Sequence, residues 1–588
     1  MIVPMKKVIL VVQSKDAENA LQELRAQGLV HMEHQRPPEG KDLQTIQEDL
    51  SLVDSVLNIL SRQEKEGLAQ EKATHSLSNW KLTAQHIVDA DKRLDQLGEF
   101  GRTLKNRIIA WEPWGDFDPE SIRALSAKGI FVRLYQVPVR GIKNLPKDLI
   151  VEKISVTSGM ANCAVISRQK RELPYKEITL PKMGLGAMRR RLEEDIRVQE
   201  TLQKEIKKHI SYLGEFILIK NSLKKELEFY QALKGMAQTA SLSYLAGYVP
   251  FDAAPRLLEK ALTQRWAIKI EEPRDEDNVP TLIRNPKWVS IIRPVFKLIE
   301  IIPGYREVDI SLWFLIFFSV FFGIIIGDAA YGLIFFLLTL GIQIKWGRRF
   351  ADKSLFFLLY LLSLSAVAWG VLSGTFFGQE WLPKTVKPLV PALRNALYVQ
   401  NLCFIIGALH LSLAHLWKLI RKFPSLSFLA EAGWISILWG AVYLARMLIL
   451  GQVFPEYGIW LFVAGAAGVI LFSSPKKNLL KGVSLGLGHF LLNAINNFTD
   501  IVSYIRLFAV GLATVAIADA FNQIAAGIGF NSIGTGIVTA FILLFGHLLN
   551  IALGPVSIIV HGVRLNVLEF CSHLDVKWSG IAYRPLRQ

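Results

Sequence analysis

Two arginines lie inside long apolar segments near the C-terminus, where a cation is least expected. Arg506 falls within residues 489–526, and Arg564 falls within residues 533–573. A charged side chain at the centre of a bilayer costs about 3 kcal/mol or more, so such residues usually serve a function or face a wet cavity. Two arginines on the last two membrane segments therefore indicate that charge is moved through the bilayer.

Polar residues accompany each arginine at helical spacing. In the first segment they recur every three or four residues and share one face: His489, Asn493, Asn496, Asp500 and Ser503. In the second segment they are His547, Asn550, Ser557 and His561, with Gly554 filling the gap. Because residues at this spacing line one side of a helix, each segment is expected to carry a wet stripe leading to its arginine.

Hydrogen bonding between packed membrane helices would explain the Asn and Ser side chains equally well. It explains the arginines less well, because the two segments hold few acids that could neutralise them. Asp500 could pair with one arginine, and Asp519 or Glu569 with the other. A carboxylate supplied by another subunit is the sharper hypothesis.

Composition divides the chain into two unlike parts. Of its 588 residues 51% are hydrophobic, but residues 1–300 are soluble in character, whereas residues 311–573 form a series of apolar runs. The net charge of +16 lies largely in membrane-flanking loops and helical charge patterns, so no nucleic-acid partner is expected. The three cysteines are far apart and form no CxxC, and no phosphate loop occurs, so neither a metal, a cofactor nor ATP binding is expected.

The soluble part is expected to contain two α/β lobes joined by long helices. Strands at 5–13 and 29–34 flank a helix at 16–27 that Gly28 ends, and a strand at 241–250 could complete this first lobe. Residues 111–179 hold short β-rich runs and form a second lobe. Apolar residues at three-four spacing in 43–60, 79–110 and 186–233 predict an antiparallel coiled coil, with a compact helical domain as the alternative. No cleavable signal begins the chain, so this part is expected in the cytoplasm.

The membrane part has apolar runs whose loops differ in charge. By the positive-inside rule, the basic loops at 345–353, 418–422 and 476–481 face the cytoplasm, and the loops near 380–395, 452–457 and 527–534 face outward. The first run, 311–344, must begin and end inside, so we expect a broken pair of helices turning near Gly327-Asp328. Each arm has about 15 residues, roughly 22 Å, which is short for about 30 Å of hydrocarbon. The fold class is thus cytoplasmic α/β lobes on an antiparallel coiled coil, then an all-α domain of about eight helices, the last two long and tilted.

Several of these segments resemble one family. Residues 499–513 (TDIVSYIRLFAVGLA) resemble the signature of the large membrane subunit of V-type and A-type rotary ATPases, called subunit a or subunit I. Residues 561–570 (HGVRLNVLEF) resemble that family's second arginine motif, and 327–332 (GDAAYG), 369–377 (WGVLSGTFF) and 29–31 (LVH) match it as well. The resemblance spans the whole chain.

The resemblance implies a mechanism. A ring of small subunits, each with a carboxylate in the membrane, would turn against this protein, and Arg506 would keep each passing carboxylate ionised, because a nearby cation favours the charged form. Arg564 would share or gate that role. Two offset aqueous half-channels would load and unload H⁺ or Na⁺. The candidates to line them are Asn496, Asp500, Ser503, Ser557, His561 and Glu569.

The resemblance also implies the setting. Residues 1–300 would be a cytoplasmic stator arm and residues 301–588 an ion-translocation domain in the plasma membrane. The implied partners are the proteolipid ring (subunit c or K), peripheral stalk subunits of E and G type, a central-stalk-associated subunit of d or C type, and membrane lipid. The chain itself would be non-catalytic.

The sequence departs from the eukaryotic pattern at two positions. Eukaryotic members have a histidine two turns after the first arginine, where this chain has Thr514, and a glutamate before the second arginine, where it has Gly554. Asp500 follows the prokaryotic pattern, so the eukaryotic half-channel assignments do not transfer.

Two other functions fit the residues taken alone. One is a secondary ion transporter with a cytoplasmic regulatory arm, although such transporters usually contain repeated halves and none is found here. The other is a membrane-anchored tether whose arginines serve packing. Co-purification with a ring of small proteolipids would separate the first function from both.

Overall fold

The computed structural model describes residues 1–588 except 34, 66–78, 147, 158, 171, 240, 351, 379–387, 474–478 and 588. The chain forms two compact units that are not divided by a single cut in the sequence. One contains Met1–Leu10, Leu29–His31 and Gly247–Pro585, and the other contains Val11–Gly28, Met32–Ala246 and Leu586–Gln588. The division of the chain near residue 300 stays a prediction.

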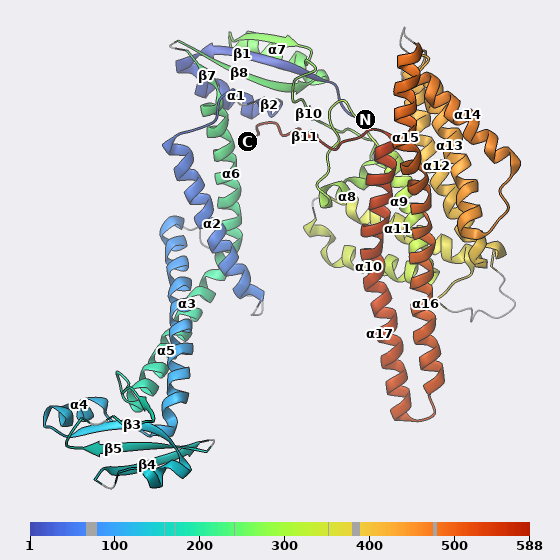
Figure 1. The fold of residues 1–588 in the computed structure, drawn as a ribbon. Helices are drawn as coiled ribbons and strands as arrows, with labels where there is room; N and C mark the ends of the chain where they lie inside the picture. The colour runs from blue at the N-terminus through green and yellow to red at the C-terminus, as the bar shows by residue number, and fades with distance from the viewer. Residues whose placement is uncertain are drawn as a thin grey trace. The chain divides into compact units, whose positions relative to one another are not determined.

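A five-stranded sheet corresponds to the first predicted lobe. Its strand order is β2-β8-β1-β9, with β7 paired to β8 (Figure 1). The helix α1 ends at Gly28, whose φ of 61° is left-handed and therefore favours glycine. The predicted strands, helix and returning strand are confirmed. The bounds are β1 Met5–Gln13, α1 Ala17–Gln27, β2 His31–Glu33, β7 Ala237–Gln238, β8 Leu242–Pro250, α7 Ala254–Thr263 and β9 Ala267–Glu271.

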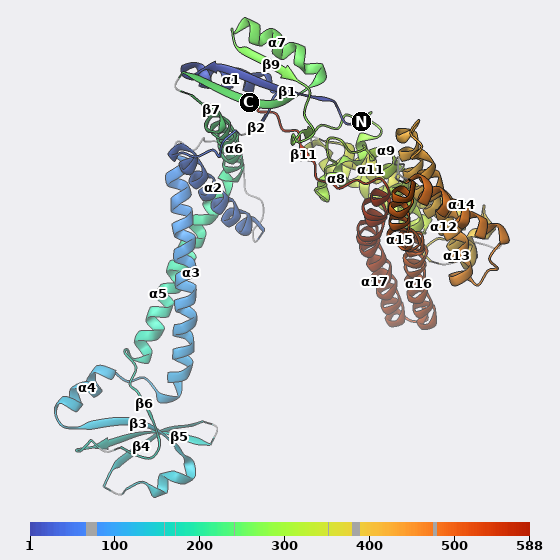
Figure 2. The same ribbon diagram turned by 45° about the horizontal axis from the view of Figure 1, so that its top comes forward.

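Four long helices pair side by side in the second unit. They are α2 (Lys41–Lys65), α3 (Trp80–Trp111), α5 (Leu185–Lys208) and α6 (Leu213–Gly235). Figures 1 and 2 show α2 beside α6 and α3 beside α5. Lys220 lies 2.5 Å from Asp54 and Lys234 lies 3.4 Å from Asp42, so residue numbers rise along α6 as they fall along α2. The pair is antiparallel; the supercoiled geometry of a coiled coil stays a prediction.

The predicted second lobe is confirmed as an antiparallel sheet with one helix. Its strand order is β4-β5-β3-β6. The helix α4 (Pro119–Ala127) is capped by Asp118, whose carboxylate accepts hydrogen bonds from two backbone N–H groups at 3.1 Å. The strands are β3 Phe131–Pro138, β4 Ile150–Thr157, β5 Met160–Ser167 and β6 Lys176–Ile178.

The apolar runs form the helices of the first unit. They are α9 Ser311–Ile326, α10 Ala329–Trp346, α11 Ser354–Ser373, α12 Ala396–Lys422, α13 Phe428–Leu450, α14 Glu456–Phe472, α15 Leu479–Ser503, α16 Ile505–Ile528 and α17 Ile533–Ser557. Among the described residues, 6 helical segments are long and apolar enough to span a membrane, and α9 and α14 are shorter apolar helices. The number and direction of the crossings stay predictions; parts of the loops on which they rest, 379–387 and 474–478, lie outside the described residues.

The predicted break of the first apolar run at Gly327-Asp328 is confirmed. Gly327 ends α9 with a φ of 67°, and Asp328 begins α10 by accepting hydrogen bonds from the backbone N–H groups of Ala330 and Tyr331. The other oxygen of the buried Asp328 carboxylate accepts from Gly378 N–H at 2.8 Å. The turn also touches Gly370 of α11 so closely that a Cβ there would lie 2.0 Å from the backbone nitrogen of Ala329.

The helix predicted over 489–526 is one long helical segment with a one-residue interruption. The helix α15 begins earlier, at Leu479, and ends at Ser503, and α16 begins after a break at Tyr504. The segment 533–573 is α17 followed by two π-helical stretches, Ile558–Gly562 and Leu565–Phe570, and by α18 (Cys571–His573). At about 1.5 Å per residue, each of these two segments is roughly twice as long as a bilayer's hydrocarbon, so their strong tilt stays a reasonable prediction.

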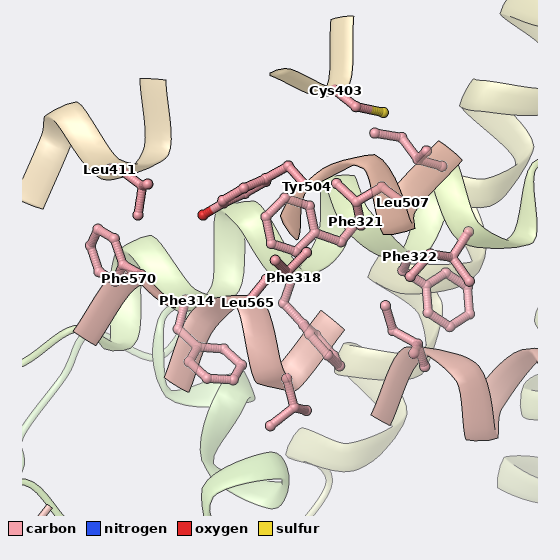
Figure 3. Close-up of a cluster of buried hydrophobic side chains, with 14 of the residues drawn as sticks. Phe314, Phe318, Phe321, Phe322, Cys403, Leu411, Tyr504, Leu507, Leu565 and Phe570 are labelled. Carbon is pink, nitrogen blue, oxygen red and sulfur yellow. The ribbon is translucent and has the colours of Figure 1, made fainter. Parts of the chain in front are cut away.

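Aromatic side chains of α9 form the core between the segments that carry the two arginines. Figure 3 shows Phe314, Phe318 and Phe321 of α9 lying among Tyr504 and Leu507 on one side and Leu565 and Phe570 on the other. The side chains drawn there are nearly inaccessible to solvent. The α9 helix therefore fixes the spacing of the two arginine-bearing segments.

Adding a methyl group to Gly370 is expected to destabilise the protein, because the new Cβ would overlap the backbone of Ala329. We expect Gly370→Ala to lower the free energy of unfolding by about 1–3 kcal/mol, the usual range for overpacking. The matched control is Gly341→Ala on α10, where a Cβ meets nothing within 4 Å and helix propensity gains about 1 kcal/mol. Thermal unfolding in detergent measures both, and equal shifts would contradict the close packing of α10 on α11.

Candidate functional site

The two arginines share one buried carboxylate. Arg506 Nη2 lies 2.6 Å from Glu569 Oε1, and Arg564 Nε lies 3.5 Å from the same oxygen. The Glu569 side chain is 4% exposed, that of Arg506 is 23% exposed and that of Arg564 is 52% exposed. The expected pairing of Glu569 with an arginine is confirmed. The expected pairing of Asp500 is wrong, because its carboxylate lies 3.1 Å from His573 Nε2 instead.

The π-helical backbone explains how Arg564 reaches Glu569. Residues five apart in an α-helix point about 140° away from each other, since each residue turns the helix by roughly 100°. In a π-helix the hydrogen bonds join residues i and i+5, so such residues lie above one another. Leu565–Phe570 is π-helical, and this places Glu569 beside Arg564. Sequence periodicity gives no sign of this widening.

The break at Tyr504 positions Arg506. In a continuous helix the carbonyl of Ser503 would accept from the N–H of Leu507, but that N–H bonds to Tyr504 O at 3.1 Å. Arg506 Nε donates to the freed Ser503 carbonyl at 3.0 Å, which satisfies an end-of-helix acceptor. The fully buried Tyr504 hydroxyl lies 2.8 Å from His410 Nδ1, so α12 holds the break in place.

A polar cavity of about 720 Å³ opens beside this cluster. Of the candidate half-channel residues it brings together Asn496, Asp500, Ser503 and Glu569, with Arg564. Its lining also includes Asn493, Asn497, Thr499, Ser572, Lys418, Lys422, His415, Glu431, His573 and Asp575. Among the described residues, Ser557 and His561 are not part of this lining, and the His561 Nδ1 atom is buried with no hydrogen-bond partner.

A chain of titratable groups on this cavity was missed by the sequence interpretation. His415 on α12 bonds to Glu431 on α13 and to His573 on α18, and His573 bonds in turn to Asp500 on α15. The rule that singled out Arg506, an ionisable residue within an apolar run, applies equally to His415 and Glu431. Their proximity to Asp500 carries no sequence signal, because their helices are far apart along the chain.

A second cavity, of about 220 Å³, lies against α16. It is lined by Leu507, Gly511 and Val515 of α16, and by residues of the α9–α10 turn and the 373–399 region, including Gly327, Ser373 and Arg394. The larger cavity reaches α15 at Ser503, and the smaller reaches α16 at Leu507. Along the chain Arg506 lies between these two lining residues, although it is not itself among the residues that line either cavity.

The first two polar residues of the segment that carries Arg564, His547 and Asn550, bond to neighbouring helices. The Tyr331 hydroxyl lies 2.8 Å from His547 Nδ1, and Asn550 Nδ2 donates to that hydroxyl and to the Thr514 carbonyl. For Asn550 the interhelical alternative therefore holds, since its side chain is buried and bonded to neighbouring helices.

Sequence comparison shows that the chain is similar to subunit I of V-type and A-type ATP synthases. It is 32% identical to V-type ATP synthase subunit I of Borreliella burgdorferi over 100% of both chains. It is 31% identical to V-type ATP synthase subunit I 1 of Treponema pallidum, also over 100% of both. It is 27% identical to A-type ATP synthase subunit I of Methanocaldococcus jannaschii over 60% of this chain and 56% of that one.

Two further comparisons add little. No family model matches the chain. The crystal structure of the cytoplasmic N-terminal domain of subunit I, homolog of subunit a, of V-ATPase covers 45% of this chain and 99% of its own, with 19% identity and a TM-score of 0.21. A score this low carries no weight for the fold.

Removal of the Glu569 charge is expected to destabilise the membrane unit, because Arg506 would lose its carboxylate in a largely buried place. We expect Glu569→Gln to lower the free energy of unfolding by roughly 2–4 kcal/mol, at the lower end of buried-pair losses because Arg506 is partly exposed. Glu456→Gln, at the exposed start of α14, is the control. Unfolding in detergent provides the comparison, and a loss of stability no larger than the control's would exclude the shared ion pair.

Proposed function

The chain belongs to the V-type ATP synthase subunit I family, and from this premise we propose that it is the stator and ion-channel subunit of such a complex. As a family member it is a membrane subunit of the ATP synthase, which acts within a multi-subunit assembly. In the proposal it is non-catalytic, it lies in the plasma membrane, and the two cavities are its half-channels.

One observation carries the proposal: the lining of the larger cavity includes Ser503 and that of the smaller cavity includes Leu507, the positions three before and one after Arg506 in the chain. Translocation past a rotor requires two aqueous paths that do not join, since a continuous path would let ions leak back. The Arg506 guanidinium would repel a cation crossing directly between the paths. The lining of the larger cavity includes Lys418 and Lys422 at the basic C-terminal end of α12, so by the positive-inside rule we assign it as the cytoplasmic half-channel.

The surface around Arg564 supports a rotor contact. Arg564 is half exposed, and exposed apolar side chains surround it along the same segment: Val556, Ile559, Val560 and Leu568. An exposed cation in an apolar strip fits a partner that is apolar but carries a carboxylate within the membrane. A proteolipid ring has this chemistry, and its carboxylate would compete with Glu569 for the two arginines.

The remaining partners follow from the stator role. The paired helices α2/α6 and α3/α5, with their α/β lobes, would bind peripheral stalk subunits of E and G type. A subunit of d or C type would link the ring to the central stalk. These contacts would keep the chain from turning with the ring.

Replacing Arg506 by lysine is expected to abolish coupled transport while leaving assembly intact. Lysine keeps the charge but loses the planar fork that joins Ser503 and Glu569, and its proton can be lost in a low-dielectric site. We expect ATP-driven ion uptake in reconstituted vesicles to fall by roughly a hundred-fold or more. Arg564→Lys, Asp500→Asn and His561→Ala should cause partial losses.

Arg446→Lys is the matched control, because Arg446 lies on a membrane helix, α13, and stacks on Tyr443, whereas Arg506 contacts Ser503 and Glu569. It should pump normally. Near-normal pumping by Arg506→Ala in an assembled complex would refute the proposed function.

Cysteine labelling is expected to place the basic loops inside the cell. The three native cysteines are buried, so background labelling should be low. In intact cells an impermeant thiol reagent should label Gln452→Cys but reach Lys353→Cys only after permeabilisation, because basic loops stay cytoplasmic. The opposite pattern would reverse the assignment of the two cavities to the two sides.

A further inference from the structure

Four buried or half-buried titratable side chains, from four different helices, form one unbranched hydrogen-bonded chain at the larger cavity. His415 Nδ1 lies 2.7 Å from Glu431 Oε2, His415 Nε2 lies 2.8 Å from His573 Nδ1, and His573 Nε2 lies 3.1 Å from Asp500 Oδ2. Glu431 is 3% exposed and His573 is 6% exposed. We call these four residues the imidazole chain.

The imidazole chain must contain one proton more than its ordinary charge states supply. Each of its three contacts needs one hydrogen between the two heavy atoms. Ionised carboxylates supply none, and each neutral imidazole supplies one, so two hydrogens are available for three contacts. The third contact forms only if an extra proton is bound, because otherwise two lone pairs would face each other.

That extra proton has four possible locations. It can sit on Glu431 as a carboxylic acid, on His415 or His573 as an imidazolium, or on Asp500 as a carboxylic acid. Each location changes into the next by a single hop along an existing hydrogen bond: one N–H or O–H bond breaks and one forms. Three hops carry the excess positive charge from Glu431 to Asp500, and all three contacts are kept.

We propose that the imidazole chain is a proton relay, which takes up a proton at the cavity wall and presents it at Asp500, near the two arginines. The inference rests on the proposed function, since it takes the larger cavity as a half-channel. It assigns a role in proton transfer to three residues that the sequence did not single out: Glu431, His415 and His573. It also makes the transported ion H⁺, because a sodium ion cannot hop along imidazoles.

Charged neighbours give the relay a direction. Glu431 also bonds to Lys422, and Lys418 lies 3.7 Å from it. Two ammonium groups favour the ionised carboxylate, so the excess proton is displaced from Glu431 toward His573 and Asp500. Asp575 accepts a hydrogen bond from Lys418 at 2.6 Å, which weakens the effect of Lys418 on Glu431. Arg564 and Glu569 line the same cavity as Asp500.

Two other readings of the cluster are weaker. A metal site is disfavoured because, among the described residues, no group of three His, Cys, Asp or Glu side chains is arranged to hold an ion. A purely structural role would need the bonds but no transferable proton. An amide can keep hydrogen bonds yet cannot pass a proton on at neutral pH, so glutamine substitutions separate the structural role from the relay.

The test is ATP-driven proton uptake by the complete reconstituted complex bearing His573→Gln or His415→Gln. We expect uptake to fall roughly ten-fold at about pH 8, where free protons are scarce, and much less at about pH 6. His86→Gln, on the exposed face of α3, is the control and should behave as the unmodified complex at both values. Equal uptake by His573→Gln and the control at both pH values would overturn the relay.

A rescue experiment guards against mere loss of packing. His573 lines the cavity, so His573→Ala leaves space in which free imidazole can replace the missing ring. Imidazole should restore uptake at about pH 8 in the assembled complex, whereas a loss that is equal at both pH values and not rescued means a structural role.

The last experiment uses the unmodified complex, so its result does not depend on whether a variant folds. Uptake should persist when Na⁺ is replaced by K⁺, and a strict requirement for Na⁺ would overturn the relay. If these tests overturn the relay while Arg506→Lys remains inactive, the proposal of two half-channels still holds. Normal pumping by Arg506→Lys would instead remove the proposed function on which the relay rests.

Discussion

The cost of keeping a guanidinium group charged in a low-dielectric place governs the membrane unit. Arginine cannot shed its proton, so it must find acceptors or reach water. Arg506 finds two, the Glu569 carboxylate and the Ser503 carbonyl. Because one carboxylate faces two arginines, the trio keeps a net charge of +1. That residual charge, half exposed at Arg564 in an apolar surface, is what makes the site able to attract another carboxylate.

Much of the surrounding structure can be understood as a means of holding this trio. The break at Tyr504 frees the Ser503 carbonyl, and His410 fixes the break from α12. The π-helical stretch brings Glu569 under Arg564. The aromatic side chains of α9 set the distance between the two segments (Figure 3). Backbone irregularities cost stability, and here the break at Tyr504 and the π-helical stretch Leu565–Phe570 each supply a contact to an arginine.

Local patterns in the sequence predicted where the helices and strands lie, but they did not predict the breaks within the helices. Capping residues and apolar spacing located β1, α1 and the paired long helices, and the charge of the loops required the turn at Gly327-Asp328. The break at Tyr504 could not be predicted, because no proline or glycine marks it and its cause is a hydrogen bond to a distant helix. The pairing of Asp500 with His573 escaped for the same reason. Spacing along one helix shows which residues share a face but not what that face meets.

The central claim is that the apolar strip around Arg564 faces the rotating ring, and it can be tested without changing any charge. A photo-reactive residue at Leu568, which is 57% exposed, should cross-link to the small proteolipid in the assembled complex and stop ATP-driven transport. The same probe at Leu448 of α13, which is 62% exposed, should give no such product. Cross-linking to the proteolipid from Leu448 but not from Leu568 would contradict the account.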